Sequence, residues 1–179
     1  MAVKEKMGKE IVNTQNTCCW YAVYTRPRSE KLVFERVSES GMEVFLPLQK
    51  TIRQWSDRKK VVEVPLLSSY VFVRIKQKQF SSVYRVAGFV KFVNFEGKPV
   101  PIPQRQIDNL KLIVNSDAVV EVTSEDFEAG DQIEVITGSL TGLTGELIRI
   151  GRKKRVVVRI DSLEKNIILT IPSTFLRKL

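Results

Sequence analysis

Alternation of apolar and polar side chains predicts a β-strand at residues 70–75, within the N-terminal two-thirds of the chain. Aromatic and β-branched residues favour a pleated surface, and successive side chains of a strand point to opposite faces. Val71 and Val73 then share one face, whereas Tyr70 and Phe72 share the other. A strand that is apolar on both faces needs cover on both. We expect helices on one face and, on the other, either a partner protein or ordinary core of this chain.

The segments on either side of this strand predict the rest of a small domain. Strands are expected at 20–25, 42–54 and 89–95, and helices at 29–41 and 80–86. The segment 59–64 is also strand-like, and Pro65 interrupts it before the strand resumes at Tyr70, so the two count as one strand. This β-α-β-β-α-β order is the split pattern of ferredoxin-like domains, in which helices cover one face of an antiparallel sheet. The other face is therefore expected to be free. One more helix is predicted at 103–114.

The pattern changes after residue 127, where short alternating and β-branched runs are typical of a small SH3-like barrel. Gly138, Gly142 and Gly145 oppose a helix here, because glycine costs a helix interior roughly 1 kcal/mol relative to alanine. We therefore predict an α+β fold class with two domains. The segments are a flexible tail at 1–16, a ferredoxin-like domain at 17–115, an acidic linker at 116–126 and a barrel at 127–179.

Composition narrows the function further. The 179 residues include 29 Lys and Arg against 20 Asp and Glu, a net charge of +9, which favours contact with a polyanion such as nucleic acid. Cys18 and Cys19 are adjacent and the chain has no histidine, so we expect no metal site, no cofactor and a reducing, cytoplasmic location. No motif indicates an enzyme, and no run approaches the ~20 apolar residues of a membrane span.

Two sets of motifs resemble a known family. The glycine-rich turn between two C-terminal strands resembles the KOW motif, at Gly130, Asp131, Gly138, Gly142 and Gly145. Trp20-Tyr21, the stretch 65–73 and the stretch 85–90 resemble the NGN domain of NusG proteins. The sequence Pro-Leu-Leu-Ser-Ser-Tyr-Val-Phe at 65–72 is more similar to the specialised RfaH and UpxY paralogues than to housekeeping NusG. The UpxY-type antiterminators of capsular polysaccharide operons resemble the chain most.

The resemblance implies a non-enzymatic elongation factor with two kinds of binding residue. RNA polymerase would be bound through its clamp helices at Leu67, Tyr70 and Phe72, and through its gate loop at Phe80, Ser81 and Ser82. Non-template DNA would be bound at Arg26, Arg28 and Lys31, while Arg85 has either a DNA-binding or a structural role. A solvated charge cluster is the alternative for these cations.

The implied function is antitermination by a monomer in particular operons. The C-terminal domain of this family binds Rho or a ribosomal protein, and Leu163 occupies the position of the Rho-contacting aromatic residue. This departure argues against Rho binding and leaves ribosome coupling open, and we expect a permanent barrel rather than a helical form. General RNA binding, as in ribosomal proteins with a KOW motif, is the alternative function. Trp55, at the tip of the hairpin formed by 42–54 and 59–64, either stacks on nucleic acid or packs back on its own sheet, and we favour packing.

Overall fold

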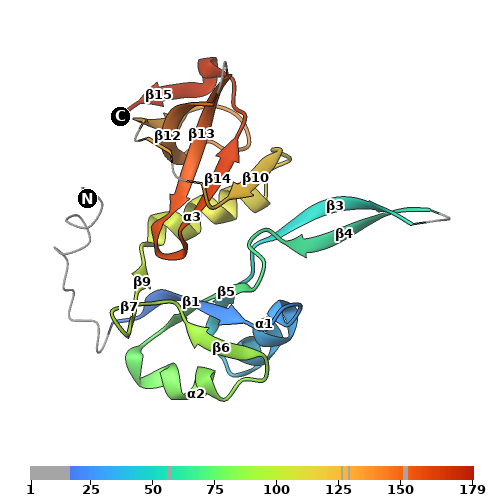
Figure 1. Cartoon of the computed structure of the whole chain (residues 1–179), viewed down its shortest axis with the longest axis vertical. Coiled ribbons are helices and arrows are strands. Elements are labelled where there is room, and N and C mark those ends of the chain that lie inside the picture. The colour runs from blue at the N-terminus through green and yellow to red at the C-terminus, as the bar shows by residue number, and fades with distance from the viewer. Residues whose placement is uncertain (1–16, 56–57, 126, 129, 151–152) are drawn as a thin grey trace.

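The computed structural model describes residues 17–179 apart from 56–57, 126, 129 and 151–152. It has a lower body built on one sheet and an upper, β-rich body, with helix α3 (Gln104–Val114) between them (Figure 1). A two-stranded arm reaches sideways from the junction. In the part of the chain described, no helix has the length and apolar character that crossing a membrane requires.

The lower sheet has the strand order β2-β5-β1-β6, and β9 pairs with the beginning of β1, at Trp20 and Tyr21. Its elements are β1 (Cys19–Thr25), α1 (Glu30–Glu39), β2 (Glu43–Phe45), β5 (Tyr70–Ile75), α2 (Phe80–Tyr84), β6 (Phe89–Phe92) and β9 (Pro101–Ile102). A small hairpin of β7 (Asn94–Phe95) and β8 (Lys98–Pro99) precedes β9. β1 and β5 are antiparallel, with Ala22 opposite Phe72. The predicted ferredoxin-like arrangement is confirmed.

The two faces of β5 belong to separate cores. Val71 and Val73 are buried together with Val37 of α1, on the face that α1 and α2 cover. Phe72 is buried on the opposite face, in a cluster that includes Leu110 of α3 and continues into the upper body. The alternation expected for this strand is therefore what the structure shows.

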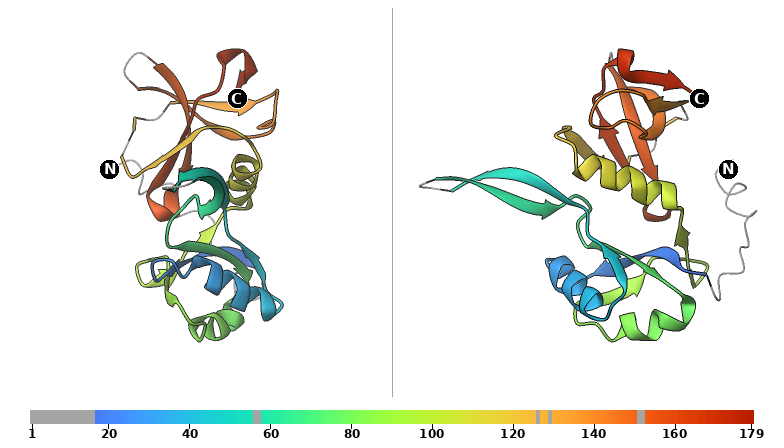
Figure 2. Two further views of the ribbon diagram at one scale, coloured as in Figure 1. Left: turned by 90° about the vertical axis from the view of Figure 1, so that its right-hand side faces the viewer. Right: turned by 180° about the vertical axis from the view of Figure 1, so that it is seen from behind.

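The expectation of a free second face is wrong for this structure. Phe72 has 0% of its surface exposed, because α3 lies across this side of the sheet and the upper body lies beyond it (Figures 1 and 2). The physical reason is the apolar stripe of α3, where Ile107, Leu110 and Ile113 are all buried. A helix with such a stripe is stabilised by burying it, and the face with Phe72 supplies apolar surface for it.

The upper body is a six-stranded antiparallel sheet with the order β10-β14-β13-β12-β11-β15. Its strands are β10 (Val120–Thr123), β11 (Asp131–Val135), β12 (Thr144–Ile150), β13 (Lys153–Ile160), β14 (Lys165–Leu169) and β15 (Leu176–Lys178). Leu143, Val156 and Ile167 are among the residues of its core. The fold class expected from the sequence, α+β with a β-rich C-terminal part, is confirmed.

The acidic linker expected at 116–126 is wrong in part. Residues 120–123 form β10, which pairs antiparallel with β14 through Val120 opposite Leu169. The reason is a short alternation that the acidic charge conceals: Val120 and Val122 lie on one side of the strand and Glu121 on the other. An edge strand tolerates such a charge because its outer side faces water.

The expected hairpin is present and forms the arm. β3 (Leu48–Gln54) pairs with β4 (Lys59–Pro65) and, within the described chain, with no other strand. The long strand expected at 42–54 is broken between β2 and β3, at Leu46 and Pro47. Proline cannot donate a hydrogen bond to a strand ladder, and here the Pro47 carbonyl accepts a hydrogen bond from the Leu66 amide at 2.8 Å. This bond joins the two ends of the arm at its base.

Trp55 lies at the tip of the arm, where its amide donates to the Arg58 carbonyl at 2.8 Å. It is 57% exposed, so the interpretation that Trp55 packs back on its own sheet is wrong.

Candidate functional site

The candidate site begins with aromatic residues on the α3 side of the lower sheet. The rings of Phe45 and Phe72 lie 6.1 Å apart between centroids, on the neighbouring strands β2 and β5. Lys111 of α3 places its Nζ 5.5 Å from the centroid of the Trp20 ring and 5.8 Å from that of Phe45. A cation over aromatic faces is attracted by the ring quadrupoles. These contacts hold α3 over the aromatic residues.

Trp20 is held by a second contact with α3. Its Nε1 donates a hydrogen bond to Oε1 of Gln104 at 2.9 Å. A buried indole N–H without an acceptor would be costly, so the side chain of Gln104 satisfies a group that the sheet cannot. Neither Gln104 nor Lys111 was singled out by the sequence. The only available signal was that both polar residues lie on the helix that carries the apolar stripe.

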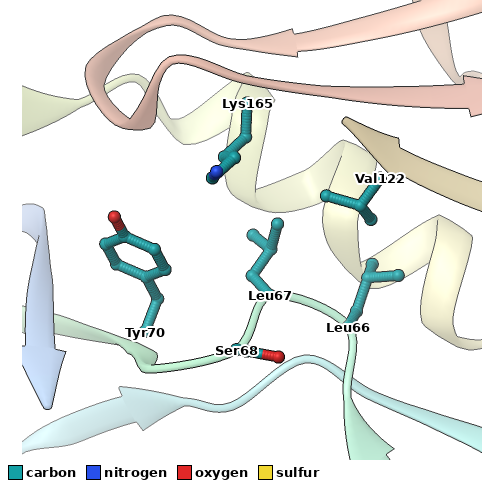
Figure 3. A pocket seen from close by; sticks show the side chains of 6 residues that line it. All are labelled: Leu66, Leu67, Ser68, Tyr70, Val122 and Lys165. Carbon is teal, nitrogen blue, oxygen red and sulfur yellow. The ribbon is translucent and has the colours of Figure 1, made fainter. Parts of the chain in front are cut away.

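Tyr70 and Leu67 lie beside this cluster, at the edge of a pocket between the two bodies (Figure 3). The pocket has a volume of about 250 Å³ and is lined by Leu66, Leu67, Ser68, Tyr70, Val122 and Lys165. Val122 and Lys165 belong to the upper body, where Lys165 Nζ donates to Ser124 Oγ at 2.5 Å. Burial, then the neighbouring Tyr24 and Glu164, raise the pKa of Tyr70 above its ordinary value. The upper body therefore covers Tyr70 in part.

A tight turn sets the position of Tyr70. Ser69 has a backbone φ of +67°, a value that few residues other than glycine adopt. Its amide donates to Oε1 of the buried Glu30 at 2.8 Å, and its carbonyl accepts from the Thr25 amide at 2.9 Å. Glu30 thus ties the start of α1 to the turn before β5. Sequence reasoning missed this residue, because an acidic residue in the first turn of a helix is ordinary.

Helix α3 is also fastened to the upper body by a pair of amide hydrogen bonds, which we call the Asn109 latch. Nδ2 of Asn109 donates to the Thr144 carbonyl at 2.9 Å, and the Thr144 amide donates to Oδ1 of Asn109 at 3.3 Å. Nε2 of Gln106 donates to Oδ2 of Asp161 at 3.1 Å. Asn109 is buried. The latch and the apolar core together join the two bodies across the face that contains Phe72.

The structure does not bring all six predicted polymerase contacts together. Leu67, Tyr70 and Phe72 lie on the α3 side of the sheet, but Phe80 lies on the other side. The Phe80 ring is 5.0 Å from Tyr21 and 4.7 Å from Phe92 between centroids, so it is part of the core there. Ser81 and Ser82 are exposed at the start of α2. The two groups thus face different directions from one sheet.

A backbone hydrogen bond joins the loop and the turn near which the predicted DNA-binding cations lie. Arg26, Arg28, Lys31 and Arg85 are all exposed. The Arg26 amide donates to the Gly88 carbonyl at 2.9 Å, which joins the loop after β1 to the turn that follows Arg85. Arg85 Nε donates to the Ser81 carbonyl at 3.2 Å. This bond restrains Arg85, whereas the other three side chains lie on a loop and the outer side of α1.

The glycine-rich turn has the strand–turn–strand form expected for it. Gly138 and Gly142 have φ of +90° and +88° between β11 and β12, and Leu140 and Leu143 are buried beneath the turn. Gly130 precedes β11 and Gly145 lies in β12, each against a neighbouring strand. Asp131 is on the surface, 2.8 Å from Lys178 Nζ. These positions are structural here, and no ligand contact is needed to explain them.

Two other expected sites have simple outcomes. Leu163, at the position expected to contact Rho, is buried in this structure. Among the residues that the structure describes, no three Cys, Asp or Glu side chains gather as a metal ion would require. Cys19 has a raised pKa because burial disfavours its thiolate, with a further contribution from Cys18.

Comparison with known proteins gives one consistent result. A family model described as "Transcription termination factor nusG" matches residues 18–111. Among curated proteins, the transcription termination/antitermination protein NusG of Pseudomonas aeruginosa is 25% identical over 149 residues, covering 75% of this chain and 83% of the relative. NusG of Neisseria meningitidis is 25% identical over 158 residues, covering 79% of this chain and 88% of the relative.

A solved structure titled "Domain interaction in Thermotoga maritima NusG" has a TM-score of 0.49 and 23% identity, and covers 91% of this chain and 98% of that chain. We call Trp20, Phe45, Tyr70 and Phe72, on the α3 side of the lower sheet, the aromatic face. The matched residues 18–111 contain this face, the arm, the four DNA-binding candidates and most of α3.

Proposed function

The chain belongs to the NusG family of transcription termination and antitermination factors, and from this premise we propose that it is a specialised elongation factor that binds RNA polymerase. It suppresses termination in particular operons, those for surface polysaccharides. The observation that carries the proposal is the family match over residues 18–111, which includes the aromatic face. Proteins of this family are transcription factors rather than enzymes.

The polymerase would bind the face that contains Tyr70 and Phe72. Aromatic side chains in the centre of an interface often supply most of its binding energy. Here Tyr70, Phe72 and Phe45 lie together on β5 and β2, with Leu67 at their edge. Clusters of this kind on one side of a sheet fit a pair of polymerase helices, whose side chains would replace α3 and the upper body.

The face is covered in this structure, so binding requires the bodies to separate. Phe72 has no exposed surface, and the Asn109 latch joins α3 to β12. A protein can change its conformation on binding only if the partner has a higher affinity for one form. The proposed mechanism is that the polymerase selects the open form and is in turn held in its processive state. In the closed form, α3 and the upper body would shield the apolar surface around Phe72 from water until polymerase binds.

The specialised role is supported by the sequence 65–72, in which Leu66, Leu67 and Ser68 depart from the Pro-Gly-Tyr of housekeeping NusG. Arg26, Arg28 and Lys31 are exposed and available to non-template DNA in the closed form. The C-terminal body would couple to a ribosomal protein rather than to Rho, because Leu163, which is buried here, stands where the resemblance places a Rho-contacting aromatic residue.

The test is single-round transcription by the source organism's polymerase on a long operon-leader template. Tyr70→Ala should abolish the increase in full-length RNA that the wild type causes. Tyr84→Ala is the matched control, because it removes the same ring from an exposed site on α2, on the other side of the sheet. Tyr70 is preferred to Phe72 because truncating a fully buried phenylalanine costs about 3–5 kcal/mol of stability. Equal activity of both variants and wild type would contradict the proposed face.

General RNA binding is the second candidate function, favoured by the net charge of +9. It predicts tight RNA binding without polymerase and no change in termination. Electrophoretic or filter-binding titration with structured RNA, beside the transcription assay, separates the two.

A further inference from the structure

The pocket between the two bodies has a polar end and an apolar end (Figure 3). At the polar end, the Nζ of Lys165 points toward Tyr70, whose hydroxyl lies on the same side. Leu66 and Val122 line the other end, and Leu67 lies between the two ends. A ligand that fits this arrangement needs a polar group and an apolar group.

Both bodies supply walls of the pocket. Leu66, Leu67 and Tyr70 come from the lower body, whereas Val122 lies on β10 and Lys165 on β14 of the upper body. The complete pocket therefore exists only in the closed form. A ligand that contacts both walls has a higher affinity for the closed form than for the open one, and such a difference is what shifts a conformational equilibrium.

The apolar end has room for a short hydrocarbon chain. The pocket has a volume of about 250 Å³, which is below the roughly 300–1,000 Å³ of sites for drug-sized ligands. Val122 is 36% exposed, although it lines the pocket beside the buried side chains of Leu66 and Leu67. A ligand with a short branched chain would remove this apolar surface from water, which favours binding.

The polar end presents donors that an anion can accept from. The ammonium group of Lys165 has three donor hydrogens, and one of them is donated to Ser124 Oγ at 2.5 Å. Among the described residues, no ion pair involves Lys165. Because burial raises the pKa of Tyr70 above its ordinary value, its hydroxyl keeps its proton at neutral pH and is also a donor.

One carboxylate opposes an anion at this end. Glu164 precedes Lys165 in the chain, and its charge contributes to the raised pKa of Tyr70. Glu164 is exposed and does not line the pocket, so water and salt screen its charge. Lys165 is half-buried and lines the pocket directly. The attraction of Lys165 for an anion should therefore exceed the repulsion by Glu164.

We propose that the pocket binds the anion of a short branched carboxylic acid, which holds the two bodies closed. The carboxylate would accept hydrogen bonds from Lys165 Nζ and the Tyr70 hydroxyl. The branched chain would pack against Leu66, Leu67 and Val122. Inorganic phosphate lacks an apolar part for these residues, and a neutral hydrocarbon leaves both donors without an acceptor.

This inference goes beyond the proposed function, because the anion requires neither polymerase nor nucleic acid to bind. Its regulatory consequence rests on the proposed function: if polymerase binds the open form, an anion that stabilises the closed form weakens polymerase binding. The pocket would then make the factor responsive to a small metabolite class, the short branched carboxylates.

The experiment is an NMR titration of the full chain with isocaproate, a carboxylate with a branched chain. Acetate keeps the charge without the chain, and isocaproamide keeps the chain without the charge. The methyl signals of Leu66, Leu67 and Val122 report on the pocket, and hydrogen exchange of the Thr144 amide reports on the Asn109 latch. A small ligand of this kind should bind with a dissociation constant on the order of 1 mM.

We expect both comparison ligands to bind at least about 10-fold more weakly than isocaproate, acetate for lack of apolar burial and the amide for lack of charge. A ligand that binds only the closed form multiplies its population by one plus the ratio of ligand concentration to dissociation constant. Isocaproate at ten times its dissociation constant should therefore slow exchange at Thr144 by about 11-fold.

Neighbouring substitutions with opposite expected effects test the electrostatic argument. Lys165→Gln should weaken isocaproate binding by about 10-fold or more, and Lys165→Arg, which keeps the charge, should restore most of the affinity. Glu164→Gln should strengthen binding by about 1.5- to 5-fold, because it removes an exposed like charge. Lys98→Gln is the matched control, since Lys98 is an exposed cation on β8, and it should bind as the wild type does.

Four results would overturn the proposal. The first is the absence of methyl shifts at isocaproate concentrations well above 1 mM. The second is equal binding of acetate and isocaproate, and the third is an equal loss of affinity in Lys165→Gln and Lys98→Gln. The fourth is binding that leaves exchange at Thr144 unchanged. Since no polymerase is present, failure here leaves the polymerase proposal standing, and failure of the transcription test leaves the anion site standing.

Discussion

Removing the Asn109 latch should open the molecule without unfolding either body. Asn109→Ala eliminates both hydrogen bonds to Thr144, measured at 2.9 and 3.3 Å between donor and acceptor. A net contribution of about 0.5–1.5 kcal/mol for each hydrogen bond gives a total of about 1–3 kcal/mol. A difference of about 1–3 kcal/mol corresponds to roughly a 5- to 150-fold change in an equilibrium constant. The ratio of closed to open molecules should fall by this factor.

Amide hydrogen exchange followed by NMR measures this change at the relevant site. The Thr144 amide donates to Asn109 Oδ1, so its exchange reports on the latch. In Asn109→Ala, exchange at Thr144 and at its neighbour Leu143 should become faster, while amides of β1 and β5 keep their rates. Asn94→Ala is the matched control, because Asn94 is an exposed asparagine on β7. Apparent affinity for polymerase should rise in the latch variant, because a larger fraction of molecules is competent to bind.

Two results would refute this reasoning. If exchange accelerates equally in β1, β5 and β12, the variant has reduced global stability and the latch does not act between the bodies. If Thr144 exchanges at the wild-type rate in Asn109→Ala, the closed form depends on the apolar core alone. A polymerase affinity that stays constant while Thr144 exchange rises would separate domain opening from function.

Single sites give three further predictions. In Gly145→Ala the new Cβ would lie 2.7 Å from a β13 carbonyl oxygen, so urea unfolding should show a loss of about 1–3 kcal/mol from overpacking. Glu146→Ala should lower the free energy of unfolding by about 1.5–3 kcal/mol, because the little-exposed carboxylate lies 3.1 Å from the Arg159 guanidinium. Asp131→Ala, on the surface, should lower it by less than about 1 kcal/mol in the same assay. Burial raises the pKa of Tyr70 above 10.0. The protonated Tyr70 side chain therefore contributes stability that is complete below pH 10 and is lost as the pH rises further. The unfolding free energy of Tyr70→Phe should fall less steeply above pH 10 than that of wild type.

Local periodicity was sufficient to predict most elements of the lower sheet. The period-two alternation of β5 placed Val71 and Phe72 on opposite faces, and the structure agrees. The glycine spacing between β11 and β12 likewise predicted a turn, with Leu140 and Leu143 buried beneath it. Both signals act over a few residues, where side-chain direction and backbone preference determine structure directly.

The cover of the aromatic face could not be predicted in this way. It depends on contacts between residues far apart in the chain, such as Trp20 with Gln104 and Asn109 with Thr144. A helix such as α3 shows which of its sides is apolar, but its sequence does not show which of two apolar surfaces it meets. In this structure α3 meets both. The ferredoxin-like pattern predicted one free face because that pattern describes a domain without a neighbour.

The arm and the aromatic face differ in how they become available to partners. The arm is exposed in the closed form, and β4 ends at Pro65, directly before the pocket residues Leu66 and Leu67. The aromatic face requires separation of the bodies, which opposes polymerase binding by the free energy of closure. Polymerase can therefore bind only if its affinity for the open form exceeds that cost.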